Sequence, residues 1–488
     1  MNNITFNPKY TLKPDYGCTL FMASLVGRNE LIGIEDSFTT VIHPIYAMIL
    51  CFINGRDSSK CIEDAAHSLD VPRDLVENFV NKLLDNPNKV VSSGKDGYST
   101  FPPYTIITQK EEIVCKRYTP DLFTYKEIDL RLKRHLTPSS ITLMVNNVCV
   151  TNCIYCYQDK SRKVHCTIPL NRIMDIIKEA KMLHINTFDI IGGEFFLYKH
   201  WREVLAELRK YGYNPYLSTK IPMEESDIQY LSKLNIHDIQ ISIDSFIESH
   251  LIDSIGVKEG YAKKMIVSLH LLEKYEIPVI IHSVLTKYNN SIDDMKSIYD
   301  ILKGMKNLVD WHIVKGDETL YPKTDYRNIE IEETALKSII GYLKTIEKDG
   351  GIKIIYPQGF EESKQHNTVD DINAIKENFF NRSFCSGLFS SLYILPDGQV
   401  TMCEQLYWNK DFIIGDVMKS SIRDIWNSKK AENLFYIKQE DIPSDSRCSK
   451  CQDFVRCRET RQVCYREIIK KYGKTKWYYP DVKCPYTK

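Results

Sequence analysis

Three cysteines in one short loop constrain this chain more than any other feature of its sequence. The stretch VNNVCVTNCIYCYQD, from Val145 to Asp159, places Cys149, Cys153 and Cys156 in a CxxxCxxC spacing. Iron and zinc both accept thiolate ligands, but structural zinc sites usually have four protein ligands. Three cysteines leave one position of a cluster or metal open for another ligand. The spacing indicates a cluster or metal with one open position, and a zinc knuckle or three unrelated buried cysteines are the alternatives.

The size and charge of the chain describe an ordinary globular protein. At 488 residues it is long enough for two or three domains. Lys plus Arg equals Asp plus Glu at 64 each, so no overall charge favours nucleic acid or a membrane surface as partner. The first residues, MNNITFNPKYTLKP, lack a basic segment followed by an apolar one, and no stretch of about 18 uncharged apolar residues occurs. We expect a cytoplasmic protein.

The chain has fifteen cysteines, which indicate bound metal because disulfides are rare in the cytoplasm. Seven of them lie near the C-terminus: Cys385, Cys403, Cys448, Cys451, Cys457, Cys464 and Cys484. The first two bracket Gly398 in a C-x12-G-x4-C pattern, and the third begins a CxxCx5Cx6C run. CxxC is also a zinc signature, so two zinc sites are the alternative to clusters here. The five scattered cysteines are expected to be small core residues: Cys18, Cys51, Cys61, Cys115 and Cys166.

Short apolar runs alternate with amphipathic helices over residues 138–320, the central predicted domain. The runs predict six strands: Ile141–Val145, Thr187–Ile191, Pro215–Ser218, Asp238–Ile243, Pro278–Leu285 and Leu308–Val314. Six βα units predict a partial (β/α)6 barrel of the α/β class, with its active site at the C-terminal ends of the strands. A connecting region is predicted over residues 321–384, before a cysteine-rich α+β domain over residues 385–488.

The sequence of residues 1–100 predicts a winged-helix domain. A hairpin is predicted from the strands Thr19–Ser24 and Leu31–Glu35, followed by helices at Phe38–Ile53, Ser59–Leu69 and Pro72–Leu84, the last with an apolar stripe of Leu75, Phe79, Val80 and Leu83. Residues 1–100 contain nine Lys or Arg and twelve Asp or Glu, so their net charge is negative. A DNA-binding surface needs a positive charge. A turn-rich linker is predicted to begin at Asn86 and to fill residues 101–137, with a short helix at Glu127–His135.

The three-cysteine loop resembles the radical SAM superfamily, in which three cysteines hold a [4Fe–4S] cluster and S-adenosylmethionine (SAM) binds the open iron. The aromatic Tyr155 before the third cysteine fits that pattern. Gly192-Gly193-Glu194, after the second predicted strand, resembles the GGE motif of the family. The resemblance implies that Gly193 and Glu194 hold the methionine amino group.

The same resemblance implies further SAM contacts at the ends of later strands. Ser218, Ser242 and Asp244 would contact the ribose and the carboxylate, and Val284 and Leu285 would pack against the adenine. A helix cap is the alternative for Asp244.

The C-terminal pattern resembles the SPASM domain, which holds auxiliary [4Fe–4S] clusters. The resemblance implies that Cys385, Cys403 and Cys464 hold auxiliary cluster I, one ligand short of four. Auxiliary cluster II then takes the remaining set: Cys448, Cys451, Cys457 and Cys484. Six residues precede Cys464 where three are usual, which departs from the family pattern. Three [4Fe–4S] clusters and SAM are thus the expected cofactors.

Together the resemblances imply an enzyme that reductively cleaves SAM to a 5′-deoxyadenosyl radical and modifies a ribosomally made precursor peptide. The stretch HPIYAMILCFINGRDSSKCIEDAA resembles the winged-helix element that binds the leader of such peptides, and a structural cap is the alternative. A thioether crosslink is preferred, because an open iron could bind a substrate thiolate, and a carbon–carbon crosslink is the alternative. A sulfatase-type (formylglycine) maturase needs no leader domain, and a winged-helix iron–sulfur regulator needs no barrel. The expected reductant is a flavodoxin or ferredoxin.

Glu404 is the candidate general base because it directly follows Cys403. In sulfatase maturases that resemble this domain, an Asp at the matching position takes the substrate proton. A Glu reaches one methylene further, and a surface or hydrogen-bonded glutamate is the alternative.

Overall fold

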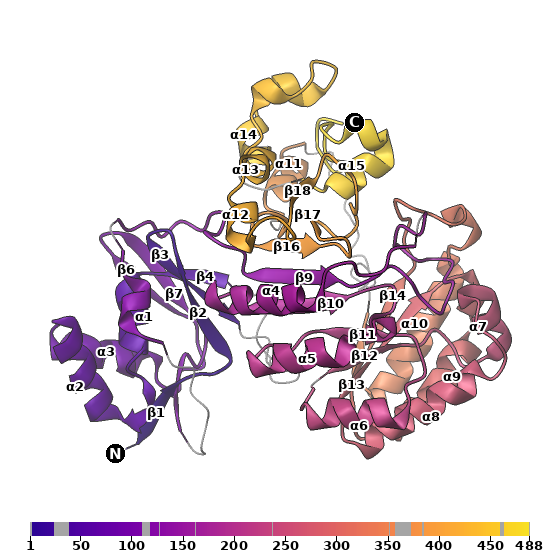
Figure 1. The fold of residues 1–488 in the computed structure, drawn as a ribbon, viewed down its shortest axis with the longest axis horizontal. Coiled ribbons are helices and arrows are strands. Elements are labelled where there is room, and N and C mark those ends of the chain that lie inside the picture. The colour runs from indigo at the N-terminus through magenta and orange to yellow at the C-terminus, as the bar shows by residue number, and fades with distance from the viewer. Residues whose placement is uncertain are drawn as a thin grey trace. The chain divides into compact units, whose positions relative to one another are not determined.

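The computed structural model describes residues 2–23, 39–109, 118–125, 127–161, 163–236, 238–350, 352–356, 372–382, 385–458 and 463–487. The chain divides into two compact units: unit 1 is Met1–Ser139 with Lys181–Thr187, and unit 2 is Ser140–Ala180 with Phe188–Lys488. Figure 1 labels most of the helices and strands of both. Among the described residues, no helix is long and apolar enough to cross a membrane.

Unit 1 contains two antiparallel sheets, three helices and a hairpin. One sheet has the order β2 (Tyr10–Asp15), β3 (Cys18–Ala23) and β4 (Thr39–Ile42), and the other has the order β5 (Asn54–Asp57), β1 (Asn3–Phe6) and β8 (Ile106–Thr108). The helices α1 (Pro44–Leu50), α2 (Ser58–Leu69) and α3 (Arg73–Leu83) are followed by the hairpin of β6 (Val90–Gly94) and β7 (Gly97–Phe101). Three helices followed by a hairpin wing match the predicted winged helix.

The predicted helix Phe38–Ile53 is wrong at its start. Residues 39–42 read TTVI and form β4, because β-branched side chains favour the extended chain. The helix begins only at Pro44, where His43 Nδ1 accepts a hydrogen bond of 3.1 Å from the Ile45 N–H. The predicted helix Ser59–Leu69 is confirmed as α2, which is capped by the side chain of Asp57.

The predicted hairpin pairs differently from the prediction. Strand β3 covers most of the predicted strand Thr19–Ser24, but its hairpin partner is β2, across the turn Tyr16-Gly17. The other predicted strand, Leu31–Glu35, lies outside the described residues.

Two further predictions in unit 1 are corrected. In α3 Leu75 is 63% exposed and Val76 is buried instead, since Val76 shares its helix face with Phe79, Val80 and Leu83. The predicted linker contains β6, β7 and β8, and residues 127–135 form no helix. Strand β8 is held by non-local pairing with β1, which turn signals cannot reveal.

The six strands predicted for the barrel all form in unit 2, but they belong to two sheets. The parallel sheet has the order β11 (Leu217–Thr219), β12 (Ile239–Ser242), β13 (Val279–Leu285), β14 (Leu308–Lys315) and β15 (Ile354–Ile355). The mixed sheet has the order β10 (Thr187–Ile191), β9 (Ser140–Met144), β16 (Ser391–Ile394), β17 (Gln399–Thr401) and β18 (Ile413–Asp416). At the break between them, the Asp189 carboxylate on β10 accepts a 2.8 Å hydrogen bond from the Tyr216 N–H, just before β11.

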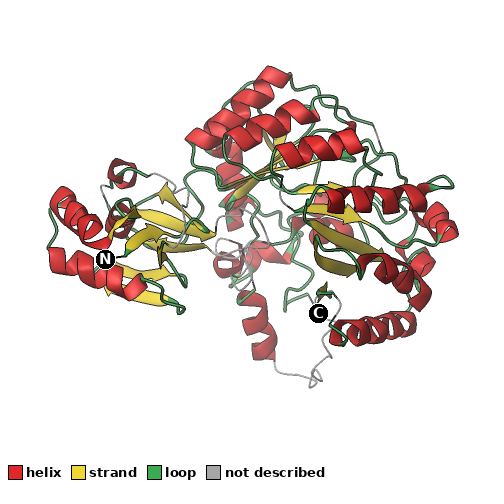
Figure 2. Cartoon of the chain, turned by 90° about the horizontal axis from the view of Figure 1, so that it is seen from below, coloured by secondary structure: helices red, strands yellow, loops and turns green. Residues whose placement is uncertain are grey.

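The helices of unit 2 surround these strands (Figure 2). Those of the barrel are α4 (Leu170–Met182), α5 (Trp201–Lys210), α6 (Glu225–Lys233), α7 (Glu248–Ile255), α8 (Tyr261–Lys274), α9 (Ile292–Leu302) and α10 (Glu333–Lys348). Those that follow are α11 (Ile372–Phe380), α12 (Ile422–Trp426), α13 (Lys429–Phe435), α14 (Phe454–Arg458) and α15 (Tyr465–Tyr472). Because β9 pairs in parallel with β16, the strand that precedes the three-cysteine loop is shared with the cysteine-rich C-terminal domain.

Candidate active site

The three-cysteine loop begins directly after β9 and is held in place by α7. The Asn152 N–H donates to the carbonyl oxygen of Ile255, the last residue of α7, at 2.7 Å. The Thr151 hydroxyl lies 3.1 Å from Cys149 Sγ and 3.3 Å from Cys153 Sγ. One hydroxyl between two thiols shows that these sulfur atoms lie on the same side of the loop.

A second set of hydrogen bonds joins the loop to the Gly-Gly-Glu turn after β10. The Gly193 N–H donates to Asn146 O at 2.8 Å, and the Glu194 N–H donates to Val148 O at 2.7 Å. The Asn146 carboxamide oxygen also accepts from the Val148 and Gly193 N–H groups, at 3.0 and 3.1 Å. A Cβ at Gly193 would lie 2.2 Å from Val148 O, so only glycine fits this close approach.

One cavity of about 600 Å³ collects most of the residues predicted for the site. They come from the loop and from the C-terminal ends of the strands: Cys149, Cys153, Tyr155, Cys156, Gly192, Gly193, Glu194, Ser218, Ser242 and Val284. Glu404 from the C-terminal domain lines the same cavity. Asp244 and Leu285 do not line it, and both are buried, with 1% and 0% of their surface exposed.

The four C-terminal cysteines predicted for auxiliary cluster II line one smaller cavity: Cys448, Cys451, Cys457 and Cys484. Aromatic side chains form half of its other lining, Phe379, Phe380, Phe454 and Tyr486, and Asp453, Arg458, Pro480 and Asp481 form the rest. Cys464 does not line this cavity.

Cys464 is instead a neighbour of the other two auxiliary cysteines. Burial, with the nearby Cys385, Glu404 and Cys464 groups, raises the pKa of Cys403 to about 12. Burial is the main cause that raises the pKa of Cys385, and the nearby Cys464 raises it further. The structure therefore separates the seven C-terminal cysteines into a group of three and a group of four.

The sequence matches two protein families. Residues 143–302 match the radical SAM superfamily, and residues 385–452 match the SPASM iron–sulfur cluster-binding domain. This chain contains a radical SAM domain and a SPASM domain. The first match includes the three-cysteine loop and the Gly-Gly-Glu turn.

Solved structures with this radical SAM/SPASM fold include those of SuiB from Streptococcus suis. The SuiB structure bound to S-adenosylmethionine has a TM-score of 0.64 and 12% identity, and the similarity covers 98% of this chain and 99% of SuiB. The structure bound to the precursor peptide SuiA has a TM-score of 0.65 and 13% identity, over 99% of both chains. The similarity confirms the predicted fold class, including an N-terminal domain before the barrel.

A curated relative of this radical SAM protein is the sporulation killing factor maturation protein SkfB of Bacillus subtilis (strain 168). It is 21% identical over 301 residues, which are 59% of this chain and 64% of SkfB. The match thus spans less than two thirds of that relative.

The side chains fit the iron–sulfur clusters and SAM that the two families imply. Three thiols beside an open cavity leave room for a ligand at a fourth iron position, and four thiols around a closed one supply a complete ligand set. Among the described residues, no three His, Cys, Asp or Glu side chains converge on a point that would suit a single metal ion. The thiols surround cavities instead.

Glu194 is the buried carboxylate of the radical SAM cavity. Burial raises its pKa to about 7, although hydrogen bonds from the Lys220 N–H, the Phe196 N–H and the Thr219 hydroxyl lower it. These bonds fix both carboxylate oxygens. A cationic amino group that enters the cavity would favour the ionised form.

Asp244 contacts Lys220 and Tyr155, which line the cavity, and does not line it itself. The Lys220 ammonium donates to Asp244 Oδ2 at 2.8 Å and to the Tyr155 hydroxyl at 2.6 Å, and Tyr155 donates to the same carboxylate. Although burial lowers the pKa of Lys220, Asp244 raises it above its usual value, so the ammonium stays charged. Lys220 and Tyr155 both line the cavity. The alternative interpretation of Asp244 as a helix cap fails, because the residue before α7 is Ile247.

Gln240, which the sequence interpretation missed, connects the two predicted serines. Its Nε2 donates to Ser218 Oγ at 2.8 Å and to Ser242 Oγ at 3.3 Å, and its Oε1 accepts from the Tyr216 hydroxyl. The period-two pattern of β12 placed Gln240 on a polar face, and that pattern was the available signal.

Glu404 meets neither alternative offered for it, an exposed glutamate or a hydrogen-bonded one. It is half-buried, and no hydrogen bond or ion pair involves its carboxylate among the described residues. Burial raises its pKa above the usual value. A carboxylate with these properties is suited to accept a proton.

Proposed function

We propose that this radical SAM protein is a cytoplasmic maturase that installs a thioether crosslink in a ribosomally made precursor peptide. The observation that carries the proposal is the shared cavity of about 600 Å³. The three loop cysteines, the Gly-Gly-Glu turn and Glu404 all line it. The groups expected to hold SAM and a group able to take a substrate proton therefore face one space.

SAM would lie along the C-terminal ends of the strands. Glu194 and the turn at Gly193 would hold its amino group, and the Lys220 ammonium, oriented by Asp244, would face its carboxylate. The ribose would meet two serine hydroxyls positioned by Gln240, Ser218 Oγ and Ser242 Oγ, and Val284 would pack against the adenine. Leu285 would support Val284 from behind.

Cys149, Cys153 and Cys156 would hold the loop cluster, which would supply the electron for reductive cleavage of SAM to methionine and a 5′-deoxyadenosyl radical. The cavity would place the peptide so that it gives up one hydrogen atom and 5′-deoxyadenosine is formed. Glu404 would take the proton of the peptide cysteine, whose sulfur then bonds to the carbon radical. The seven C-terminal cysteines would hold auxiliary clusters, which would supply the acceptor for the one remaining electron, so that the peptide loses two hydrogen atoms overall.

Unit 1 is proposed to bind the leader of the precursor. SuiB, which shares this fold, has been solved bound to its precursor peptide SuiA, and this supports a peptide-binding role. In unit 1, β4 and β2 are the edge strands of their sheet, and a peptide can add to such an edge as an extra strand. The net negative charge of residues 1–100 supports a peptide over DNA.

The proposal predicts SAM cleavage and peptide oxidation by the anaerobically reconstituted protein. Dithionite, SAM and the precursor should give 5′-deoxyadenosine and a peptide that has lost two hydrogen atoms and no longer reacts with iodoacetamide. A product of the same mass that still alkylates at every cysteine would instead indicate the carbon–carbon crosslink. A hydrazide-reactive aldehyde would indicate the formylglycine maturase, and no deoxyadenosine with any peptide would contradict the proposal.

A further inference from the structure

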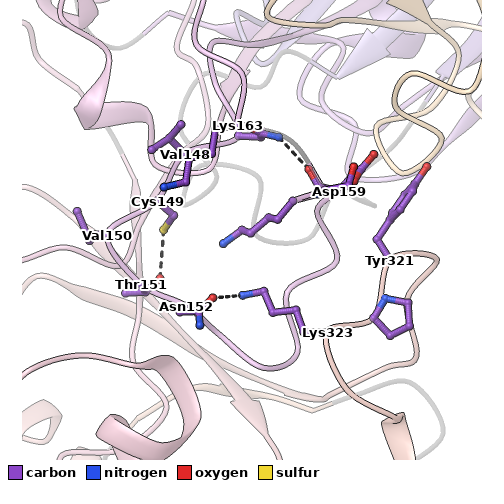
Figure 3. Close-up of a pocket in the computed structure, with 13 residues that line it drawn as sticks. Val148, Cys149, Val150, Thr151, Asn152, Asp159, Lys163, Tyr321 and Lys323 are labelled. Carbon is purple, nitrogen blue, oxygen red and sulfur yellow. Dashed lines mark hydrogen bonds between the residues drawn. The ribbon is translucent and has the colours of Figure 1, made fainter.

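A basic depression lies on the outer side of the three-cysteine loop. It has a volume of about 660 Å³ and is formed by residues 147–152, residues 159–161 with Lys163, and residues 321–323. Figure 3 shows Cys149 and Thr151 on one side of it and Tyr321 on the other, with Lys163 and Lys323 at its two ends.

Positive charge gathers in this depression although the chain as a whole is balanced. Its lining has three lysines, Lys160, Lys163 and Lys323, against one acid, Asp159. Lys163 and Lys323 are exposed. Three like charges that line one depression repel one another. An acidic partner would relieve this repulsion.

The depression and the inner cavity share a wall. Cys149, Thr151 and Lys160 line both of them. Lys323 binds the wall from outside, with its Nζ donating to Asn152 Oδ1 at 2.5 Å and to the Cys153 carbonyl oxygen at 3.0 Å. An electron that arrives in the depression therefore reaches a cysteine of the loop without crossing the cavity in which SAM and the peptide would bind.

The lining of the depression also offers an apolar contact. Val150, the residue after Cys149, belongs to this lining and is 54% exposed. Weak protein–protein contacts combine such apolar groups with charged ones.

We infer that this depression, lined by Cys149, Lys160, Lys163 and Lys323, is the docking site of an acidic one-electron carrier protein of the flavodoxin or ferredoxin class. The inference rests on the proposed function, because reductive SAM cleavage needs such a carrier. Attraction between opposite charges raises the rate of encounter, and the effect weakens as salt screens it. The shared wall then places the carrier beside the loop that it reduces.

The test compares two reductants on the reconstituted full-length protein. Lys163→Glu reverses a charge that lines only the outer depression, and Ser161→Glu adds a negative charge beside it without removing a lysine. Lys264→Glu, on an exposed position of α8, is the matched control. SAM cleavage is measured as 5′-deoxyadenosine, with either a purified prereduced flavodoxin or dithionite as the electron source.

With limiting flavodoxin at low ionic strength, kcat/KM for the carrier should fall on the order of tenfold in both test variants, mainly through KM. It should not fall in the control, and the wild-type value should drop as salt is added. Rates with dithionite should stay at the wild-type level in all three variants. Wild-type flavodoxin rates in both test variants, or an equal loss in Lys264→Glu, would overturn the docking site.

Two outcomes separate this inference from the proposed function. If the wild-type protein cleaves no SAM with dithionite, the proposed function is wrong, and the docking site, which rests on it, is wrong as well. If dithionite works but Lys163→Glu weakens binding of a fluorescent precursor and leaves the carrier kinetics unchanged, the depression is a peptide site and the inference is wrong.

Discussion

The two cysteine-lined cavities of unit 2 differ in nearly every property that matters for chemistry. The barrel cavity has three cysteines, a volume of about 600 Å³ and ionisable walls that include Glu194, Lys220 and Glu404. The C-terminal cavity is much smaller, at about 20 Å³, and has four cysteines, with Phe379, Phe380, Phe454, Tyr486 and the buried Arg458 among its lining. A complete ligand set in a small cavity suits electron transfer, whereas an incomplete set beside a large cavity leaves room for binding and reaction. The missing fourth cysteine is therefore what makes the first cavity a site for a substrate.

Removal of one loop cysteine is the most direct test of the difference between the two cavities. Cys153→Ala should abolish 5′-deoxyadenosine formation, because no other group replaces that ligand. About eight of about twelve irons should remain after anaerobic reconstitution, since the auxiliary ligands are intact. Cys166→Ala, at a half-buried cysteine outside both cavities, is the control and should retain cleavage. Undiminished deoxyadenosine in Cys153→Ala would move the reaction away from the barrel cavity.

The shape of the barrel cavity depends on Gly193. In Gly193→Ala the new Cβ would meet Val148 O at 2.2 Å, so the loop or the turn must shift. A displacement of about 1 Å at a reacting centre costs on the order of 10²-fold, and SAM cleavage should fall by that factor. Gly341→Ala, where the added Cβ meets nothing within 4 Å, should be neutral. Equal activity in the two variants would show that the contact between turn and loop is dispensable.

Glu404 tests whether the barrel cavity moves a proton as well as binding SAM. Glu404→Gln keeps the shape and removes the base, so single-turnover crosslinking should slow on the order of 10²-fold while deoxyadenosine is still produced. The carboxylate accepts a proton only when ionised, and burial raises its pKa. Wild-type crosslinking should therefore decline, as the pH falls, at a higher pH than an ordinary glutamate would give. Mass spectrometry across a pH series measures this decline. If Glu404→Gln has the same pH profile of crosslinking as the wild type, Glu404 is not the base.

The smallest effect is expected in the four-cysteine cavity. Arg458 is 2% exposed, and its Nη2 lies 3.5 Å from Cys448 Sγ and 2.8 Å from the Tyr479 carbonyl oxygen. A buried cation beside a cluster ligand favours the reduced cluster. In a background without the loop cysteines, Arg458→Gln should lower the auxiliary midpoint potential on the order of 60 mV, a tenfold change for one electron.

Arg458→Lys should recover most of that shift, since the lysine keeps the charge. Potentials are read by EPR-monitored titration, with iron content as the folding control. Equal potentials in Arg458→Gln, Arg458→Lys and the parent at full iron content would show that the cation does not tune the cluster.

Local patterns predicted the barrel strands well, because each strand is a short apolar run between helices. Strand β10 has the predicted bounds and β13 and β14 differ by one residue each. The pairing of β9 with β16 joins segments about 250 residues apart, and no local pattern reports it. The strand TTVI lies within the predicted helix Phe38–Ile53, and its β-branched residues favour the extended chain instead.

The sequence predicted the site residues that belong to motifs. It missed the residues that only the folded structure brings into the site. The resemblance to SPASM domains implied the cysteine groups that the structure keeps together, including the separation of Cys464 from the four-cysteine cavity. Asn146 and Gln240 belong to no recognised motif, and their bonds to Gly193 and Ser218 join segments that are distant in sequence. Lys220 follows Ser218 by two residues, but only the structure shows its ion pair with Asp244.

The exposure of Cys464 carries a practical consequence. It is the exposed member of its group of three, whereas Cys385 and Cys403 are partly covered. A cluster held there would meet dissolved oxygen at that corner before the enclosed four-cysteine cavity does. Protein purified in air should lose iron and sulfide first from this position, and glovebox handling would decide whether the third cluster is seen at all.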